Sequence, residues 1–139
     1  MKHTIAANRM RGGYVKKAVS CLVRASSARL VRQVATRSDL VTIDVSFISV
    51  TLILPVLPPL INPESELLVL VKPQFEVGRG QVGKGGIVRD PYLHQEAVEK
   101  VSRTIIQLGF SEIVSAESIL PGAEGNREYF LHALWKQPA

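Results

Sequence analysis

The run Leu40-Val41-Thr42-Ile43-Asp44-Val45 does most to decide the fold of this chain. It is rich in β-branched residues and almost continuously apolar, which is typical of a strand buried on both faces of a parallel sheet. A second run, Leu67-Leu68-Val69-Leu70-Val71, has the same character and is closed by Lys72-Pro73. Two such strands predict an α/β domain built on a parallel sheet.

Helix signals follow these strands. Ser49 is expected to cap a helix from about Val50 to Leu60, which Pro55 must kink or shorten. Asn62-Pro63 predicts a turn. Asp90-Pro91 predicts a helix start, because an acidic N-cap precedes proline at the first helical position. The predicted buried face of this helix is an apolar stripe of Leu93, Ala97, Val101, Ile105 and Leu108.

Two further strands are expected near the end of the chain, at 112–118 and 128–134. The order strand, helix, strand, helix, strand, strand favours a mostly parallel sheet. No helix separates the last two strands, and tight connections join antiparallel neighbours, so one strand is expected to be antiparallel.

Residues 1–38 are basic and harder to interpret. Nine Lys/Arg and no acid precede Asp39, which suits either a phosphate-binding arm or a solvated tail. A helix within Lys16 to Val34 is possible but has no convincing apolar face. If upstream strands are missing, the Asp44 strand becomes an exposed apolar edge. We expect this edge to pair in a homodimer, to be covered by the N-terminal arm, or to make the protein poorly soluble.

Composition excludes several classes of protein. Cys21 is the single cysteine, so neither an internal disulfide nor a four-thiolate metal site can form, and a reduced, cytoplasmic setting is expected. His3, His94 and His132 show no metal-ligand spacing. The most apolar region, 50–61, is too short to span a bilayer and contains three prolines.

Asp44 and Lys72 each follow one of the two predicted parallel strands. Ligands of open α/β sheets bind at the carboxyl ends of strands, so the two side chains are expected to converge in one crevice. A partly buried lysine beside a carboxylate can serve as a general base toward a hydroxyl. A purely structural salt bridge is the alternative.

Four motifs connect the chain to a known family. They are Asp44-Val45-Ser46-Phe47-Ile48-Ser49, Val71-Lys72-Pro73-Gln74-Phe75-Glu76, Gly83-Lys84-Gly85-Gly86-Ile87-Val88-Arg89-Asp90 and Gly125-Asn126-Arg127-Glu128. In this order they closely resemble the C-terminal catalytic part of the TlyA (hemolysin A) family of FtsJ-like RNA methyltransferases. The resemblance covers about Asp39 to Trp135, so residues 39–139 are expected to form a partial Rossmann-like methyltransferase sheet.

The resemblance implies S-adenosylmethionine-dependent methylation of a ribose 2′-hydroxyl in ribosomal RNA, without a metal. The family has a Lys-Asp-Lys-Glu catalytic tetrad. By motif, its aspartate, second lysine and glutamate correspond to Asp44, Lys72 and Glu128. Lys72 would take or share the hydroxyl proton, and the two carboxylates would orient the lysine and the ribose. Asp44 and Val45 are implied to contact the cofactor.

The segment before Asp39 departs from the family pattern. The expected Gly-x-Ser-x-Gly-Gly cofactor loop is absent. Arg11-Gly12-Gly13-Tyr14 resembles the segment before the first catalytic lysine, but Val15 stands in its place and Lys16 follows one residue late. A truncated methyltransferase is therefore expected, and a non-catalytic RNA-binding remnant of the family is the alternative.

The glycine-rich loop from Gln74 to Arg89 contains two misleading matches. Residues 78–83 fit G-x-G-x-x-G and 78–84 begin like a P-loop, but no helix is expected at residue 83, and Gly85 replaces the magnesium-binding Ser/Thr. We expect a flap over the substrate or a flexible surface loop. Phe75 is expected to stack on a target base or to join the core. RNA phosphates are the expected ligands of Arg79, Lys84 and Arg89.

Overall fold

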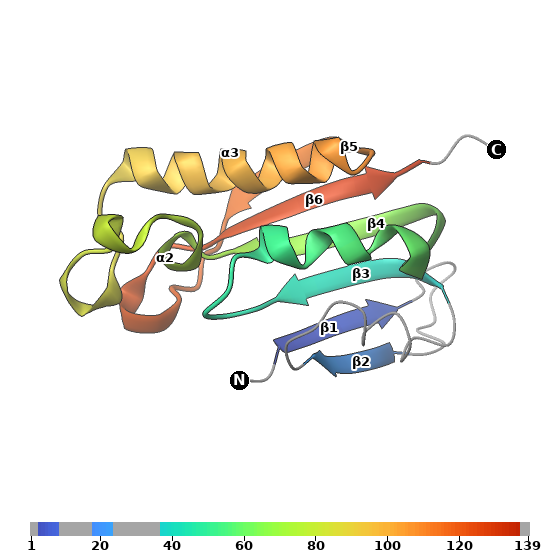
Figure 1. Cartoon of the computed structure of the whole chain (residues 1–139), viewed down its shortest axis with the longest axis horizontal. Helices are drawn as coiled ribbons and strands as arrows, with labels where there is room; N and C mark the ends of the chain where they lie inside the picture. The colour runs from blue at the N-terminus through green and yellow to red at the C-terminus, as the bar shows by residue number, and fades with distance from the viewer. Residues whose placement is uncertain (1–2, 9–17, 24–36, 137–139) are drawn as a thin grey trace.

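The computed structural model describes residues 3–8, 18–23 and 37–136, which form one mixed sheet with helices (Figure 1). The strand order is β2-β1-β3-β4-β6-β5. The strands are β1 (His3–Asn8), β2 (Ala18–Val23), β3 (Ser38–Asp44), β4 (Ile61–Val71), β5 (Phe110–Glu117) and β6 (Tyr129–Trp135).

Strand directions agree with the sequence. β3 and β4 pair in parallel, with Ile43 opposite Val69. β6 is antiparallel to both β4 and β5, so β3, β4 and β5 run one way and β6 runs the other. The prediction of an α/β fold with a mostly parallel C-terminal sheet and one antiparallel strand is confirmed for these four strands.

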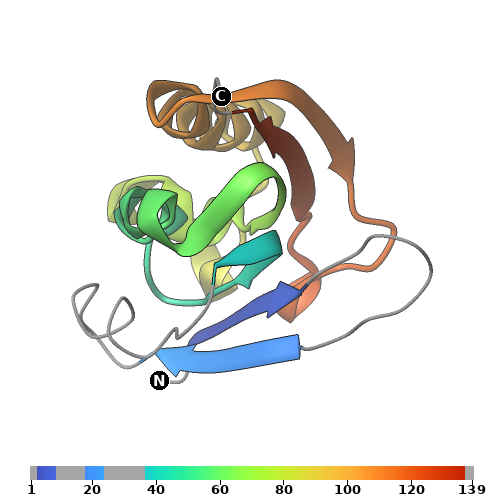
Figure 2. The same ribbon diagram turned by 90° about the vertical axis from the view of Figure 1, so that its right-hand side faces the viewer.

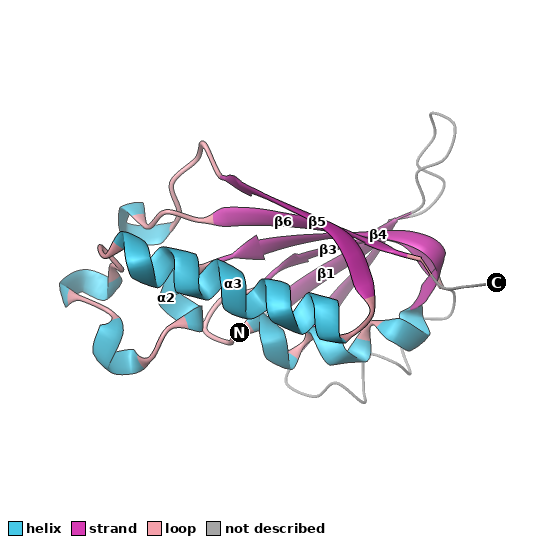
Figure 3. Ribbon diagram, turned by 90° about the horizontal axis from the view of Figure 1, so that it is seen from above, coloured by secondary structure: helices cyan, strands magenta, loops and turns pink. Residues whose placement is uncertain are grey.

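The described helices cover one face of the sheet (Figure 3). They are α2 (Pro73–Glu76) and α3 (Pro91–Gln107). Asp90 is the N-cap of α3, and its carboxylate accepts a hydrogen bond from the backbone N–H of Tyr92, as the Asp90-Pro91 signal predicted. The helix expected over 50–60 is instead three 3₁₀ turns, Val50–Leu52, Leu54–Val56 and Pro58–Leu60, because prolines cannot donate α-helical hydrogen bonds.

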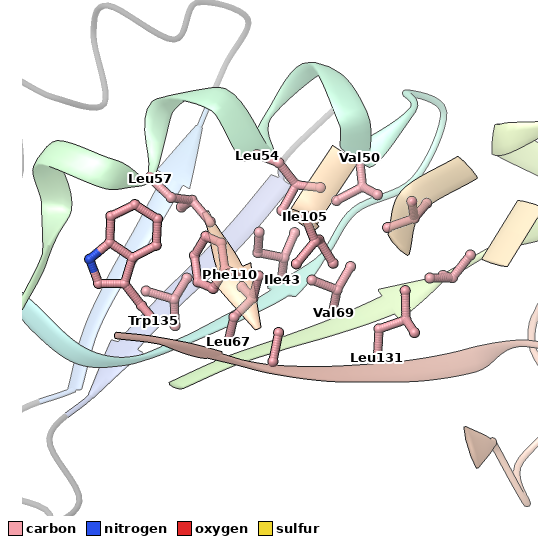
Figure 4. Close-up of a cluster of buried hydrophobic side chains, with 14 of the residues drawn as sticks. Ile43, Val50, Leu54, Leu57, Leu67, Val69, Ile105, Phe110, Leu131 and Trp135 are labelled. Atoms are coloured by element: carbon pink, nitrogen blue, oxygen red, sulfur yellow. The ribbon is translucent and has the colours of Figure 1, made fainter. Parts of the chain in front are cut away.

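The core lies between the sheet and these helices (Figure 4). Ile43, Val69 and Leu131 of adjacent strands pack against Leu54 and Ile105, and all five side chains are almost fully buried. Within the predicted α3 stripe, Ala97, Val101 and Ile105 are buried, and Leu93 and Leu108 are only partly so. Burial of this apolar surface is the main stabilising term of the fold.

The turn expected at Asn62-Pro63 is wrong as a boundary, because β4 already begins at Ile61. The chain departs from regular pairing there all the same. Ser38 pairs with Ile61 and Leu40 with Glu66, so β4 has three extra residues at this point, and Glu64 has a positive φ of 62°. The turn residues form an irregularity within the strand.

The N-terminal part adds two strands that the sequence did not predict. β1 pairs antiparallel with β3, and β2 pairs with β1 (Figure 2). The helix considered within Lys16 to Val34 is therefore wrong at Ala18–Val23, and the rest of that range lies outside the described residues. Since β1 covers the edge of β3, the homodimer expected at that edge is not needed to pair it.

Within residues 3–8, 18–23 and 37–136, no helix combines the length and apolar character needed to cross a bilayer.

Candidate active site

Lys72 and Asp44 meet at the carboxyl ends of β4 and β3. The Nζ atom of Lys72 lies 2.8 Å from Oδ1 of Asp44 and donates a hydrogen bond to Oγ of Ser46 at 3.1 Å. The lysine side chain is only 14% exposed, whereas the carboxylate is 66% exposed. An ammonium group has three donors. The described residues supply these two partners, and the open carboxylate places the pair within reach of a ligand.

Glu128 approaches the same edge of the sheet from the next strand. Val71 pairs with Tyr129 in the β4–β6 ladder, so Glu128 lies beside Lys72 along the backbone. Its side chain is buried against Gly122, where any Cβ atom would overlap the carboxylate. No hydrogen bond or salt bridge to this carboxylate is found in the described ranges. The ion pair thus joins two of the three predicted catalytic residues, with the third placed beside them.

An aromatic pair is formed by the residues that follow each member of the ion pair by three positions, Phe47 and Phe75. Phe47, three residues after Asp44, has a left-handed φ of 65° and is 66% exposed. Its ring centroid lies 4.9 Å from that of Phe75, which is partly buried. A bulky residue in this backbone conformation is an outlier that often marks a functional segment. A stacking role was predicted from the sequence for Phe75 but not for Phe47, although Phe47 lies within the motif that begins at Asp44.

Asn126 ties the glycine-rich loop to the segment that carries Glu128. Its buried side chain accepts a hydrogen bond from the Val88 N–H at 3.1 Å and donates to the carbonyls of Gly86 at 2.9 Å and Ala123 at 3.1 Å. Both amide hydrogens and the amide oxygen of Asn126 are therefore hydrogen-bonded, and the side chain fixes the spacing of the two loops. The sequence showed the motif but not these partners.

His94, on α3, supports the same region. Its Nε2 atom donates to the Val88 carbonyl at 2.6 Å, and its Nδ1 atom accepts from the Tyr129 hydroxyl at 3.0 Å, because a carbonyl can only accept. Burial raises the pKa of Tyr129, and the Glu117 carboxylate adds to this shift while Arg127 opposes it. His94 is therefore a satisfied structural residue.

The three basic residues predicted to contact RNA lie on the loop between α2 and α3. Arg79, Lys84 and Arg89 are exposed, and the loop extends beyond the edge where β4 ends (Figure 1). The guanidinium of Arg89 donates to the Lys84 carbonyl at 3.4 Å. The glycines form two short 3₁₀ turns, and no helix begins at residue 83, so neither nucleotide-binding motif has its required structural context.

The site has the charge balance that a cationic cofactor requires. Asp44 contacts the Lys72 ammonium, and Glu128 adds a second carboxylate on the neighbouring strand end, so this edge of the sheet carries two acidic groups and one basic group that could accommodate a sulfonium. The Val45 side chain is buried in the core, so only its backbone is available to a ligand. In the part of the chain that the structure describes, Oε1 of Gln74 is buried and accepts no hydrogen bond. These residues fit a donor-bearing cation.

Comparison with known proteins assigns the chain to a class. The family model described as "FtsJ-like methyltransferase" matches residues 11–134. The chain therefore belongs to the FtsJ-like methyltransferase family.

Individual relatives refine this assignment. The "16S/23S rRNA (cytidine-2'-O)-methyltransferase TlyA" of Mycobacterium tuberculosis is 48% identical over 95 residues, covering 68% of this chain and 35% of that protein. The "Putative rRNA methyltransferase YqxC" of Bacillus subtilis is 46% identical over 97 residues, covering 70% and 34%. The chain thus spans about a third of the length of these relatives.

A solved structure gives the same result. The crystal structure of a "putative hemolysin" from Lactococcus lactis is 48% identical to this chain, with a TM-score of 0.68, and the match covers 72% of this chain and 48% of that one. The fold and the motifs of this chain are therefore those of the TlyA and hemolysin A branch of the family.

Proposed function

We propose that this chain carries the catalytic edge of an S-adenosylmethionine-dependent ribosomal RNA ribose 2′-O-methyltransferase. The observation that supports this most is the Lys72–Asp44 pair, in which the lysine is largely buried and the carboxylate is open at the carboxyl end of two parallel strands. Two relatives named as rRNA methyltransferases carry the same region.

Each of three residues has a defined role in this proposal. Lys72 holds the ribose hydroxyl and, as a neutral amine, takes or shares its proton. The two N–H bonds of that amine are directed to Asp44 and Ser46, which leaves its lone pair toward the hydroxyl. Asp44 keeps the lysine in place. Glu128, whose carboxylate has no hydrogen-bond or salt-bridge partner among the described residues, orients the ribose from the same edge. Most of the rate comes from alignment of the hydroxyl with the methyl donor.

S-Adenosylmethionine, when bound, supplies the methyl group from its sulfonium. The Asp44 carboxylate and the Val45 backbone would hold it at the end of β3. The glycine loop expected for this cofactor is absent from the sequence, so affinity for the cofactor in this chain rests on few residues.

RNA would be bound by charge and by stacking. Arg79, Lys84 and Arg89 would contact phosphates. The Phe47–Phe75 pair, three residues after Asp44 and Lys72 respectively, offers an aromatic surface on which an extruded base would stack. Residues 39–139 would form the catalytic part, and residues 1–38 a basic arm.

Calorimetric titration with S-adenosylmethionine tests cofactor binding, and a salt series of ribosomal RNA binding tests the arm. We expect both to bind. Salt-sensitive RNA binding without any cofactor binding would instead support a non-catalytic remnant.

A further inference from the structure

We propose that Glu76 is a positioning residue for the Lys72–Asp44 pair, an inference that rests on the proposed function of that pair. Glu76 ends the one-turn helix α2, which begins directly after Lys72. Its side chain is only 2% exposed. A buried carboxylate is costly unless it is well paired, so its partners indicate its purpose.

Glu76 joins α2 to the segment that follows Asp44. Its Oε1 atom accepts from the Val50 N–H at 2.8 Å, and its Oε2 atom accepts from the Ser49 hydroxyl at 2.6 Å. Lys100 of α3 supplies the compensating charge at 3.2 Å from Oε2 and also donates to the Glu76 carbonyl at 2.8 Å. Three donors therefore contact the two oxygens of the buried Glu76 carboxylate.

These bonds close a ring around the site. Lys72 and Glu76 are held at a fixed separation because α2 is a single hydrogen-bonded turn, with the Phe75 N–H bonded to the Lys72 carbonyl at 2.9 Å. Asp44 and Ser49 are the two ends of the segment that pairs with α2. Lys72 contacts its start and Glu76 contacts its end. Loss of the Glu76 bonds frees this segment to move away from Lys72.

Glutamine at this position is a sharp test because it keeps size and removes charge. One amide oxygen can still accept from Val50. The amide nitrogen, however, faces the Ser49 hydroxyl and Lys100, both of which act as donors to the carboxylate. The Ser49 hydroxyl can accept from the amide, because it also lies 2.6 Å from Oγ1 of Thr51, to which it can then donate. The main loss therefore falls on the Lys100 contact.

Trace acetylation followed by peptide mass spectrometry measures how accessible the Lys72 amine is, and it does not require enzymatic activity. In the wild-type chain Lys72 should react slowly, since it is paired and 14% exposed. Asp44→Asn should raise its reactivity and so calibrate the assay. Glu76→Gln should raise Lys72 reactivity about tenfold, the population change expected for one or two lost hydrogen bonds. The reactivity of Lys84, which is exposed on the loop after α2, should be unchanged.

Controls separate positioning from general loosening. Glu99→Gln, an exposed carboxylate on α3, should leave Lys72 unchanged. Amide hydrogen exchange in β4 and β6 should match the wild type. If Glu76→Gln does not fold, Ser49→Ala removes the hydroxyl bond to Glu76 together with the Ser49 side-chain bonds to Thr51, keeps the Val50 bond to Glu76, and should give a smaller rise at Lys72.

The inference is overturned if Asp44→Asn exposes Lys72 while neither Glu76→Gln nor Ser49→Ala does. If Asp44→Asn itself has no effect, the ion pair of the proposed function is wrong, and the positioning role fails with it.

Discussion

Two lysine–carboxylate pairs flank α2 and have opposite exposure. In the Lys72–Asp44 pair the lysine is 14% exposed and the carboxylate 66%. In the Lys100–Glu76 pair the lysine is 40% exposed and the carboxylate 2%. The first pair presents an open, incompletely surrounded group to solvent, whereas the second buries a fully bonded one. We infer that the first serves chemistry and the second serves architecture.

The largest effect is expected from removing the reactive amine. Lys72→Met should lower methyl transfer to ribosomal RNA at least ~100-fold, as expected for loss of a general base. Lys100→Met removes a similar side chain from the other pair and should lower activity far less, by about tenfold at most, because Lys100 acts only through Glu76. A radiolabelled methyl-transfer assay compares the two, and equal losses would contradict the distinction between the pairs.

The next largest effect concerns stability. Glu76→Ala leaves the buried Val50 N–H without an acceptor and should lower the free energy of unfolding by about 2–3 kcal/mol. Urea denaturation measures this change. Glu99→Ala, on an exposed part of α3, should change it by about 0.5 kcal/mol or less. If the Glu76→Ala variant is as stable as the Glu99→Ala variant, the buried Lys100–Glu76 pair does not contribute to the stability of the fold.

Asn126 tests whether the loops around the site depend on one buried side chain. Asn126→Ala removes three hydrogen bonds and should lower the free energy of unfolding by roughly 1–3 kcal/mol, because the Val88 N–H and the carbonyls of Gly86 and Ala123 lose their partner. Limited proteolysis should then cut near Gly86 faster. An unchanged cleavage rate would mean that other contacts hold the loop.

The smallest expected effect on stability comes from the open pair. Asp44→Asn should change the free energy of unfolding by less than about 1 kcal/mol, because the Asp44 side chain is 66% exposed and asparagine keeps an oxygen that accepts from Lys72. The same denaturation experiment applies. A loss as large as that of Glu76→Ala would favour the purely structural salt bridge.

Local signals in the sequence were enough for the C-terminal strands and for α3. The apolar runs ending at Asp44 and Val71 gave β3 and β4, and Asp90-Pro91 gave the start of α3. β1 and β2 were missed because they depend on pairing with β3, which no local pattern encodes. Prolines changed the expected helix after Ser49 into 3₁₀ turns.

The site was predictable only in part for a similar reason. Strand ends placed Asp44 and Lys72 at one edge, and the family motif added Glu128. Glu76 and Asn126 could not be assigned, because their partners lie 24 to 40 residues away in the sequence. Contacts of that range are decided by packing rather than by periodicity.

Alkaline digestion of RNA labelled from S-adenosyl[methyl-³H]methionine by this chain measures the central claim most directly. A 2′-O-methyl group blocks cleavage of the adjacent phosphodiester, so the label should appear in alkali-resistant dinucleotides and disappear with Lys72→Met. Label recovered in mononucleotides, or transfer that persists in Lys72→Met, would contradict a ribose methylation site built on Lys72 and Asp44.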